Sequence, residues 1–201
     1  GPVKFKPEVN FSTDSVGLVH GLAWTSVGGE VLDVECSVVP GNGKLELTGN
    51  LGDVMKESCQ AAVTYIRSRT SELGIDPDFH KNTDIHLHFP EGAVPKDGPS
   101  AGAAICLCVV SALTNRPVRA DIAMTGEITL RGRVLPIGGI QEKTMAALRA
   151  GIHEVLLPED NVSDLAEMDP NVRNAVNFTA VSHMDQVLKK ALRPSGEKVA
   201  E

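Results

Sequence analysis

One serine and one lysine stand in the two most informative segments of this 201-residue chain. Ser100 follows Pro-Lys-Asp-Gly-Pro and comes just before a long apolar stretch, whereas Lys143 ends the segment Gly-Gly-Ile-Gln-Glu-Lys. A serine hydroxyl attacks a peptide carbonyl only when a base removes its proton, and a lysine amine acts as that base only in its neutral form. The two segments together predict a serine–lysine peptidase domain.

The segment around Ser100 predicts a nucleophile at the mouth of a helix. Pro99 suits the first helical position, where its missing N–H is not needed. Ser100 is then expected in the first turn, beside N–H groups that lack partners within the helix and stabilise an oxyanion by roughly 3 kcal/mol each. Gly98 permits close approach of a substrate backbone. The alternative for Ser100 is a structural helix cap, and Asp97 is either the N-cap of this helix or a residue that gates the serine.

The pattern around Lys143 predicts a lysine on the apolar side of a helix over residues 140–150. At about 100° per residue, Lys143 falls between Ala147 and Ala150, and the opposite side carries Gln141, Glu142 and Arg149. Burial lowers the pKa of an amine, and so does a place in the first turn of a helix. A fall from about 10.4 to about 7–8 corresponds to roughly 4 kcal/mol. The alternative is a lysine whose ammonium reaches water past the alanines.

Other catalytic motifs fit less well. Residues 98–102 read Gly-Pro-Ser-Ala-Gly, but a nucleophile elbow of the α/β-hydrolase type directly follows a strand, and here the loop 95–99 intervenes. The histidines that would have to complete such a triad, His153 and His183, lack suitable surroundings. The stretch 139–144 is not a phosphate-binding loop, because no glycine directly precedes its lysine.

Two histidines and one tryptophan receive structural interpretations. His86 and His88 share one face of an alternating strand and could form half of a metal site. No third ligand has a suitable spacing, so a hydrogen-bonded structural pair is preferred. Trp24 is interpreted most simply as a core residue.

The composition is that of a soluble globular domain with an aliphatic core, because 42% of the residues are hydrophobic and only 3% are aromatic. The net charge of −7 argues against nucleic-acid binding, which needs clustered cations. The longest apolar run, residues 101–110, is far shorter than the ~20 residues that span a bilayer. No C-x-x-C spacing is present, so free thiols in a reducing, cytoplasmic compartment are expected for Cys36, Cys59, Cys106 and Cys108.

Hydrophobic periodicity divides the chain into short strands and helices without strict alternation. Strands over 16–24 and 30–39 are expected to form a hairpin around Gly28-Gly29. Further strands are expected over 44–48, 85–89, 122–125, 127–130, 134–137, 154–157 and 178–181. Helices are expected over 53–73, from about 97–100 to 113, 140–150, 162–168 and 184–192. The second helix is apolar on all sides and should be buried. The predicted fold class is α/β in the broad sense, or α+β.

The chain resembles the proteolytic domain of Lon, the ATP-dependent protease, from Val16 to Leu192. The resemblance rests on segments that together are highly specific: Gly-Leu-Ala-Trp-Thr at 21–25, His-Phe-Pro-Glu-Gly-Ala at 88–93, the stretch 95–102, Met-Thr-Gly-Glu at 124–127 and the stretch 135–143. The form Asp-Gly-Pro-Ser resembles the bacterial A-type.

The resemblance implies roles for individual residues. Ser100 maps to the nucleophile and Lys143 to its general base, a dyad that uses neither histidine nor aspartate. Thr125 would bond to the lysine and orient it. Asp97 lies where family members block or release the serine, and Gly98 supports the same loop. The implied fold is the ribosomal protein S5 domain 2-like arrangement.

The chain is expected to divide into residues 1–14, a tag remnant or linker arm, residues 15–192, the proteolytic domain, and residues 193–201, a disordered tail. The resemblance implies a homohexameric ring that cleaves unfolded polypeptides, without membrane or nucleic-acid partners. No cofactor is implied, because in Lon proteins ATP binds an AAA+ module that this chain does not contain. A non-catalytic ring scaffold is the alternative, and the presence of Ser100 and Lys143 argues against it.

Overall fold

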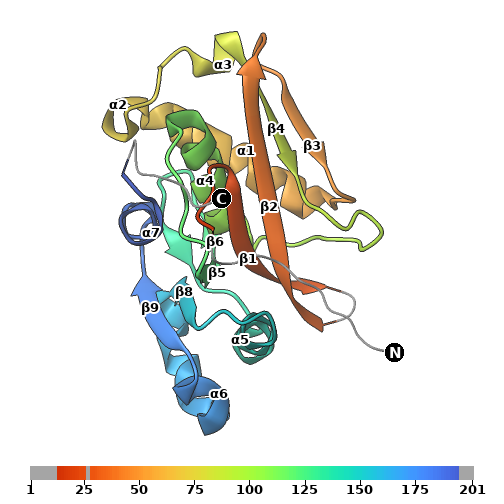
Figure 1. Ribbon diagram of the computed structural model, residues 1–201, viewed down its shortest axis with the longest axis vertical. Coiled ribbons are helices and arrows are strands. Elements are labelled where there is room, and N and C mark those ends of the chain that lie inside the picture. Colours follow the sequence, from red (N-terminus) through yellow and green to blue (C-terminus); the bar gives the residue numbers. More distant parts are fainter. Residues whose placement is uncertain (1–12, 26–27, 195–201) are drawn as a thin grey trace.

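The computed structural model describes residues 13–25 and 28–194 of the chain. Its strands form a mixed seven-stranded sheet in the order β3-β4-β2-β1-β5-β8-β9, and β6 and β7 form a separate two-stranded sheet (Figure 1). The strands are β1 (Leu18–Thr25), β2 (Gly28–Pro40), β3 (Leu45–Thr48), β4 (Thr83–His88), β5 (Ile122–Met124), β6 (Glu127–Ile128), β7 (Val134–Leu135), β8 (Glu154–Pro158) and β9 (Asn177–Val181). The helices are α1 (Asp53–Ser68), α2 (Thr70–Leu73), α3 (Phe79–Asn82), α4 (Gly102–Thr114), α5 (Ile140–Arg149), η1 (Glu159–Glu167), α6 (Pro170–Asn174) and α7 (Met184–Ala191). The predicted α/β class is confirmed.

The first two strands form a long antiparallel hairpin near the centre of the sheet. Thr25 lies opposite Gly28 in their register, so Gly28 and Gly29, which the sequence predicts in the turn, belong to β2. β4 adds to β2 in antiparallel orientation, whereas β5, β8 and β9 follow β1 in parallel. Parallel neighbours need crossover connections. The crossover from β5 to β8 contains α5, and the crossover from β8 to β9 contains η1 and α6.

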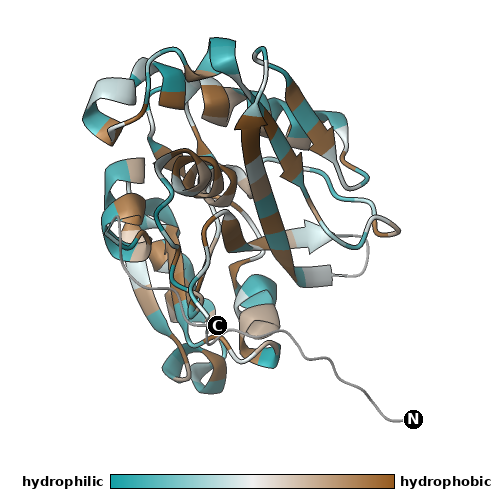
Figure 2. Ribbon diagram, turned by 45° about the horizontal axis from the view of Figure 1, so that its top comes forward, coloured by the Kyte–Doolittle hydropathy of each residue, from teal (hydrophilic) through white to brown (hydrophobic). Residues whose placement is uncertain are grey.

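Helices cover both faces of the sheet. Adjacent residues of a strand point to opposite faces. On β1, Ala23 packs into the core that includes α1 and α4, and its neighbour Leu22 packs with Ala147 of α5. Helix α4 is buried along residues 102–111, as its apolar sequence predicts. Figure 2 shows hydrophobic residues concentrated on the inner helix and on the strands beside it.

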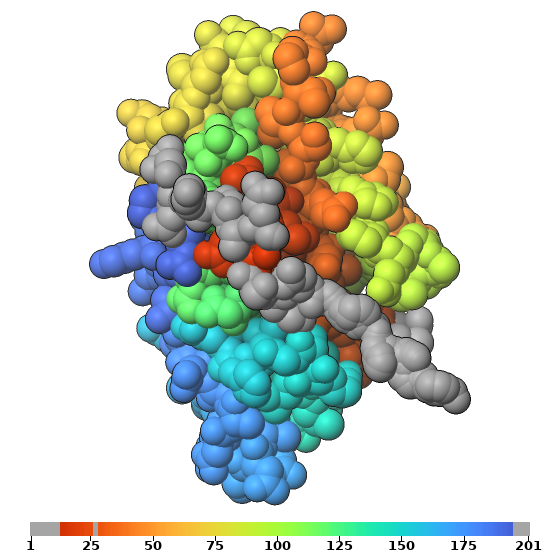
Figure 3. Space-filling view, in the orientation of Figure 1, coloured from red at the N-terminus to blue at the C-terminus, as the bar shows by residue number. Residues whose placement is uncertain are grey.

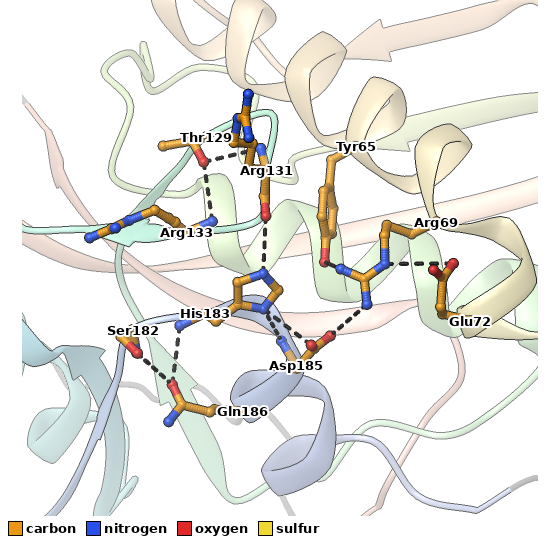
Figure 4. Close-up of polar contacts among 10 residues, drawn as sticks. All are labelled: Tyr65, Arg69, Glu72, Thr129, Arg131, Arg133, Ser182, His183, Asp185 and Gln186. Carbon is orange, nitrogen blue, oxygen red and sulfur yellow. Dashed lines mark hydrogen bonds and ion pairs between the residues drawn. The ribbon is translucent and has the colours of Figure 1, made fainter.

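The single helix predicted over 53–73 is interrupted at Arg69. This residue has φ −128° and ψ 21°, and it separates α1 from the short α2. Its guanidinium donates to the Tyr65 hydroxyl at 3.2 Å and pairs with Asp185 of α7 at 3.4 Å (Figure 4). A contact with a distant helix therefore accompanies the break. The predicted last residue, Leu73, is confirmed, and Gly74 caps the helix end in the left-handed conformation.

Three short helices differ from the predictions, and one of them, α3, has no counterpart among the expected elements. The helical segment expected over 162–168 is a 3-10 helix that begins at Glu159. The short α6 was not expected, although Asp169 caps it by accepting from the Asn171 N–H and Pro170 occupies its first turn. This helix lies at the blue end of an elongated molecule (Figures 1 and 3).

The first and last described residues lie close together. Asp14 pairs with Arg193 at 2.9 Å, so these two residues of the predicted arm and tail are held by an ion pair. The limits 15–192 for the proteolytic domain stay a prediction. The remaining parts of the arm and tail, residues 1–12 and 195–201, lie outside the described residues.

The four cysteines are free thiols, as predicted. Burial raises the pKa of Cys59 and of Cys106 to about 12, so these thiols are protonated and poorly reactive at neutral pH. None of the described helices is long and apolar enough to cross a membrane.

The histidine pair of β4 is hydrogen-bonded. The Thr48 hydroxyl bonds to His86 Nε2 at 2.8 Å and to His88 Nδ1 at 2.6 Å. Across residues 13–25 and 28–194, no three histidine, cysteine or acidic side chains form a group that could hold a metal ion. Both histidines are hydrogen-bonded, as the preferred interpretation predicts, and the expectation that they bind no metal stays a prediction.

Candidate active site

Ser100 lies in the loop between β4 and α4, one residue before the helix cap. Helix α4 begins at Gly102 and Ala101 is its N-cap, so the predictions of Ser100 in the first turn and of Pro99 at the first helical position are wrong. Two main-chain bonds explain the difference. The Gly102 N–H donates to the Pro99 carbonyl at 3.2 Å, and the Ser100 carbonyl accepts from the Gly126 N–H at 2.8 Å. The second bond draws Ser100 toward the end of β5, and the helix-cap alternative is also excluded.

Two main-chain N–H groups at the serine are not used by the fold. Within the described ranges, the N–H groups of Ser100 and Ala101 have no hydrogen-bond partner. The sequence predicts such unpaired donors, and they are present. The turn before the helix supplies them, whereas the prediction assigned them to the first turn of the helix.

Lys143 lies in the first turn of α5, shortly after the left-handed N-cap Gly139. The residue is only 2% exposed, so the alternative of an ammonium that reaches water is wrong. Burial lowers the pKa of Lys143 to about 8, the direction that the sequence predicts. In the described part of the chain its Nζ donates one hydrogen bond, to the Thr125 hydroxyl at 3.3 Å.

Gly29 lets helix α5 pack closely against β2. A Cβ atom at this position would overlap the carbonyl group of Glu142, and the Gly29 carbonyl accepts from the Arg149 guanidinium at 3.2 Å. Any side chain here would push the first turn of α5 away from the hairpin. The position of Lys143 therefore depends on a glycine in a distant part of the sequence.

Thr125 connects the two candidate catalytic residues. It follows β5 and is 1% exposed. Its hydroxyl donates to the Ser100 carbonyl at 3.3 Å and accepts from the Lys143 amine at 3.3 Å. Next to it, the Gly126 carbonyl accepts from the Ala103 N–H at 3.0 Å. The end of β5 thus holds the serine loop and the lysine in one network.

Ser100 and Lys143 line one cavity of about 480 Å³, together with Glu127, Trp24 and residues 136–139. Trp24 is 51% exposed, so its interpretation as a core residue is wrong. Its ring lies close to Gly139, where a Cβ atom would come within 2.9 Å of the indole. An apolar strand pattern gives no sign that the surface is hollow at this place, so this wall of the cavity could not be predicted from the sequence.

The serine and the lysine share the cavity without a direct hydrogen bond between their side chains in the described ranges. Catalytic hydrogen bonds are often long before a substrate binds and shorten in the complex. The hollow therefore combines a serine side chain with an amine of lowered pKa, and the two unpaired N–H groups lie at the serine.

Asp97 caps a different helix from the one predicted. Its carboxylate accepts from the Met55 N–H in the first turn of α1 at 3.0 Å and from the Gly98 N–H at 2.8 Å. These bonds lower the pKa of Asp97. The N-cap position of α1 is Gly52, where a Cβ atom would overlap the Asp97 carboxyl group. The interpretation of Asp97 as the N-cap of α4 is therefore wrong, and its gating role stays a prediction.

Gly98 supports the same loop through its backbone conformation. Its φ of 98° lies in the left-handed region that favours glycine. The Cβ position is open, so any penalty for a larger residue would come from backbone strain.

The histidines that a hydrolase-type triad would need are bonded elsewhere. His183 accepts from the Asp185 N–H at 3.0 Å, and its Nε2 bonds to the Arg131 carbonyl at 3.0 Å (Figure 4). His153 bonds to the Ala175 carbonyl at 3.1 Å. Among the described residues, neither histidine lines the cavity that contains Ser100.

Comparison with known proteins decides the family. The family model of the Lon protease (S16) C-terminal proteolytic domain matches residues 1–194. The chain belongs to this family. It is 59% identical over 187 residues to the Lon protease of Brevibacillus choshinensis, 57% over 197 residues to Lon protease 2 of Desulfotalea psychrophila and 58% over 185 residues to Lon protease 1 of Bacillus subtilis.

The matches cover 92%, 98% and 92% of this Lon proteolytic domain but only 24%, 26% and 24% of those three relatives. The chain therefore spans about a quarter of their length. The resemblance that the motifs predict is confirmed, and the family is one of proteases, which are hydrolases.

Within this Lon domain, Thr125→Val should lower kcat/KM for a short peptide by about tenfold, the effect of losing one buried hydrogen bond to the Lys143 amine. The substitution also removes the partner that stabilises the ammonium form of Lys143. The midpoint of the pH–rate profile should therefore fall below about 8. Peptidase rates measured between mildly acidic and alkaline pH give both quantities.

Thr144→Val is the matched control for this prediction. Thr144 is a buried threonine next to Lys143 in α5, and its hydroxyl donates to the Ile140 carbonyl at 2.8 Å. Its loss should leave the pH midpoint unchanged. If Thr125→Val kept the peptidase rate and the pH midpoint of the original chain, Thr125 would have no influence on Lys143.

Proposed function

We propose that the chain is a serine endopeptidase domain in which Ser100 is the nucleophile and Lys143 the general base. The observation that carries the proposal is the buried Lys143 amine, whose pKa is lowered to about 8 and which lines the same cavity as Ser100. Such an amine is neutral in about a tenth of the molecules at pH 7, and only a neutral lysine can act as a base. Membership of the Lon proteolytic-domain family supports the proposal.

In the proposed reaction, neutral Lys143 takes the hydroxyl proton of Ser100 while the serine oxygen attacks the scissile carbonyl carbon. The N–H groups of Ser100 and Ala101 stabilise the oxyanion of the tetrahedral intermediate. The Lys143 ammonium then protonates the leaving amine, the carbon–nitrogen bond breaks, and an acyl-enzyme ester remains. Lys143 next removes a proton from water, which attacks the ester, and the proton returns to the serine oxygen as the acid product leaves. Thr125 orients the amine, and Asp97 and Gly98 shape the serine loop.

Further properties of the whole protein and of this domain are proposed with this reaction. The protein is an ATP-dependent protease, ATP binds an AAA+ module outside this chain, and the domain itself uses no cofactor. It acts in a homohexameric ring on unfolded polypeptides in the cytoplasm, without membrane or nucleic-acid partners. The domain comprises residues 15–192 and has the ribosomal protein S5 domain 2-like fold.

A peptidyl β-lactone tests the proposal against its rival, a ring-forming domain without catalysis. An activated serine opens the lactone and keeps the acyl group, which mass spectrometry locates on a peptide. We expect one adduct, on Ser100, formed faster as the pH rises toward 8 and absent from Ser100→Ala. The scaffold would be supported if neither labelling nor peptide hydrolysis occurred, both in the folded domain alone and in the full-length ring.

A further inference from the structure

A second lysine, Lys96, is buried next to the serine loop, and the proposed reaction does not use it. The residue is 3% exposed. Its ammonium donates to the Gly49 carbonyl at 2.7 Å, the Glu91 carbonyl at 2.7 Å and the Val94 carbonyl at 2.9 Å. An ammonium has three N–H donors, so all of them are bonded.

Lys96 and Lys143 are both buried, but the hydrogen-bond partners of their amines favour opposite charge states. In the described part of the chain Lys143 has one neutral hydroxyl partner, which favours loss of its proton. Lys96 has three carbonyl dipoles directed at its nitrogen, and no carboxylate forms an ion pair with it among the described residues. Burial lowers the pKa of Lys96 as well, but a neutral amine could not donate all three bonds. The carbonyls therefore require the ammonium form, and Lys96 is unsuited to act as a base.

The three carbonyls tie together two segments that are distant in sequence. Gly49 belongs to the turn after β3, whereas Glu91 and Val94 belong to the loop after β4. Glu91 has a φ of 65°, in the left-handed region that is uncommon for residues other than glycine. The ammonium thus occupies the centre of a loop whose carbonyls converge on one point, much as a bound cation would.

The main chain of Lys96 is also hydrogen-bonded to the segment that follows β3, on the side of the loop that leads to Ser100. Its N–H donates to the Asn50 carbonyl at 3.0 Å, and its carbonyl accepts from the Gly52 N–H at 2.8 Å. The next residue, Asp97, caps α1, and Ser100 follows three residues later. Upstream of the serine, the loop is therefore fixed by the Lys96 ammonium, the Lys96 main chain and the Asp97 carboxylate in succession.

We infer that Lys96 is a positioning residue of the peptidase, whose ammonium gathers the carbonyls of Gly49, Glu91 and Val94 and thereby sets the place of Ser100 relative to Lys143. The inference rests on the proposed function, since it matters for rate only if Ser100 is the nucleophile. The sequence gives one weak signal for it, a lysine between Pro95 and Asp97 in a loop that must be held in place.

The test compares Lys96→Met with the original domain on a short fluorogenic peptide. Removal of the ammonium leaves the Gly49 and Val94 carbonyls unpaired, whereas the Glu91 carbonyl keeps only its bond from the Val94 N–H at 3.1 Å. The loop is then less constrained, and a displacement of about 1 Å at a reacting group costs on the order of 100-fold in rate. We expect kcat to fall about 100-fold, KM to change by less than about threefold, and the pH midpoint near 8 to stay, because the burial of Lys143 is unaltered.

Two control variants separate positioning from stability. Lys44→Met removes a lysine whose side chain is 66% exposed, and it should leave kcat unchanged. Val187→Ala opens the core at α7, a region outside the serine loop, and reports how activity responds to lost stability alone. If Lys96→Met loses no more activity than Val187→Ala at a temperature where both are folded, the inference is overturned. The inference would also be overturned if Lys96→Met shifted the pH midpoint but left the maximal kcat at high pH unchanged, because Lys96 would then act on the charge of Lys143.

Restoring the ammonium provides a positive test. Lys96→Cys should be as slow as Lys96→Met, and alkylation with 2-bromoethylamine, which rebuilds a side chain of lysine length with an ammonium at its end, should recover most of kcat. The original chain is alkylated in parallel as a control for the effect of modifying its four own cysteines.

If neither Lys96→Met nor Lys96→Cys folds, Lys96→Gln keeps two N–H donors without the charge. A kcat for this variant equal to that of the original would refute the inference. Inactivity of the original chain itself would instead count against the proposed function.

Discussion

Replacing Ser100 by alanine should reduce kcat for peptide hydrolysis on the order of 10⁶-fold, to the rate left by substrate binding and the N–H donors alone. The hydroxyl is the atom that forms the acyl bond in the proposed reaction, and no other group in the cavity can take its place. The fold should be unaffected, because the half-buried hydroxyl makes no hydrogen bond of its own in the described ranges. Turnover of a fluorogenic peptide and thermal unfolding of the same sample give the two readings.

Ser111 provides the matched control within the same domain. Its hydroxyl is fully buried in α4, accepts from the Gly17 N–H at 2.9 Å and donates to the Arg116 carbonyl at 2.6 Å. Ser111→Ala should lower stability by about 1–3 kcal/mol, since a buried N–H loses its partner, and should leave kcat of the folded protein unchanged. Substantial turnover by purified Ser100→Ala would remove this serine from the mechanism.

Replacing Lys143 by methionine should lower turnover about 10²–10⁴-fold and at the same time stabilise the fold. Loss of a general base costs about 10²–10⁴-fold in rate. The lowered pKa of Lys143 means that holding its charge in the folded state at pH 7 costs about 3 kcal/mol. A methionine of similar length fills the same space without a charge and should recover much of that free energy. Lys143→Arg should lower turnover as well, because a guanidinium does not lose its proton in proteins.

The pH dependence of the original domain follows from the same amine. Only neutral Lys143 accepts the serine proton, so kcat/KM should rise with pH through about 8 and level off above it. The folded-state pKa lies below the unfolded value of about 10.4, and between these values the unfolded chain binds more protons. The free energy of unfolding should therefore increase with pH across that interval, relative to Lys143→Met.

Peptidase rates and urea unfolding at matched pH values provide the measurements for Lys143. The difference between the original chain and Lys143→Met isolates this residue from other groups that titrate in the same range. A rate that stays constant from mildly acidic to alkaline pH, or full activity in a verified Lys143→Met protein, would exclude the lysine as the base.

The strands, the buried helix α4 and the burial of Lys143 could be predicted because each follows from a local pattern of residue types. Alternation of apolar residues places Ile85 and Leu87 in the core, and both are buried. The alanines that follow Lys143 at helical spacing place its amine on the apolar side of α5. Family motifs added the link between these segments.

The details that could not be predicted depend on contacts between distant segments. Helix α4 starts after Ser100 because the serine carbonyl bonds to Gly126. Asp97 is the cap of α1, which lies far upstream. The ammonium of Lys96 is surrounded by carbonyls from two loops. No local pattern records these partners, since periodicity describes one element at a time.

Trp24 is the only tryptophan in the sequence, and its half-exposed indole borders the cavity beside Gly139. Indole fluorescence responds to the polarity and wetness of its immediate surroundings. The tryptophan fluorescence of this protein therefore originates at the rim of one hollow. The domain carries a built-in optical probe of what enters that hollow, and no dye has to be attached to observe it.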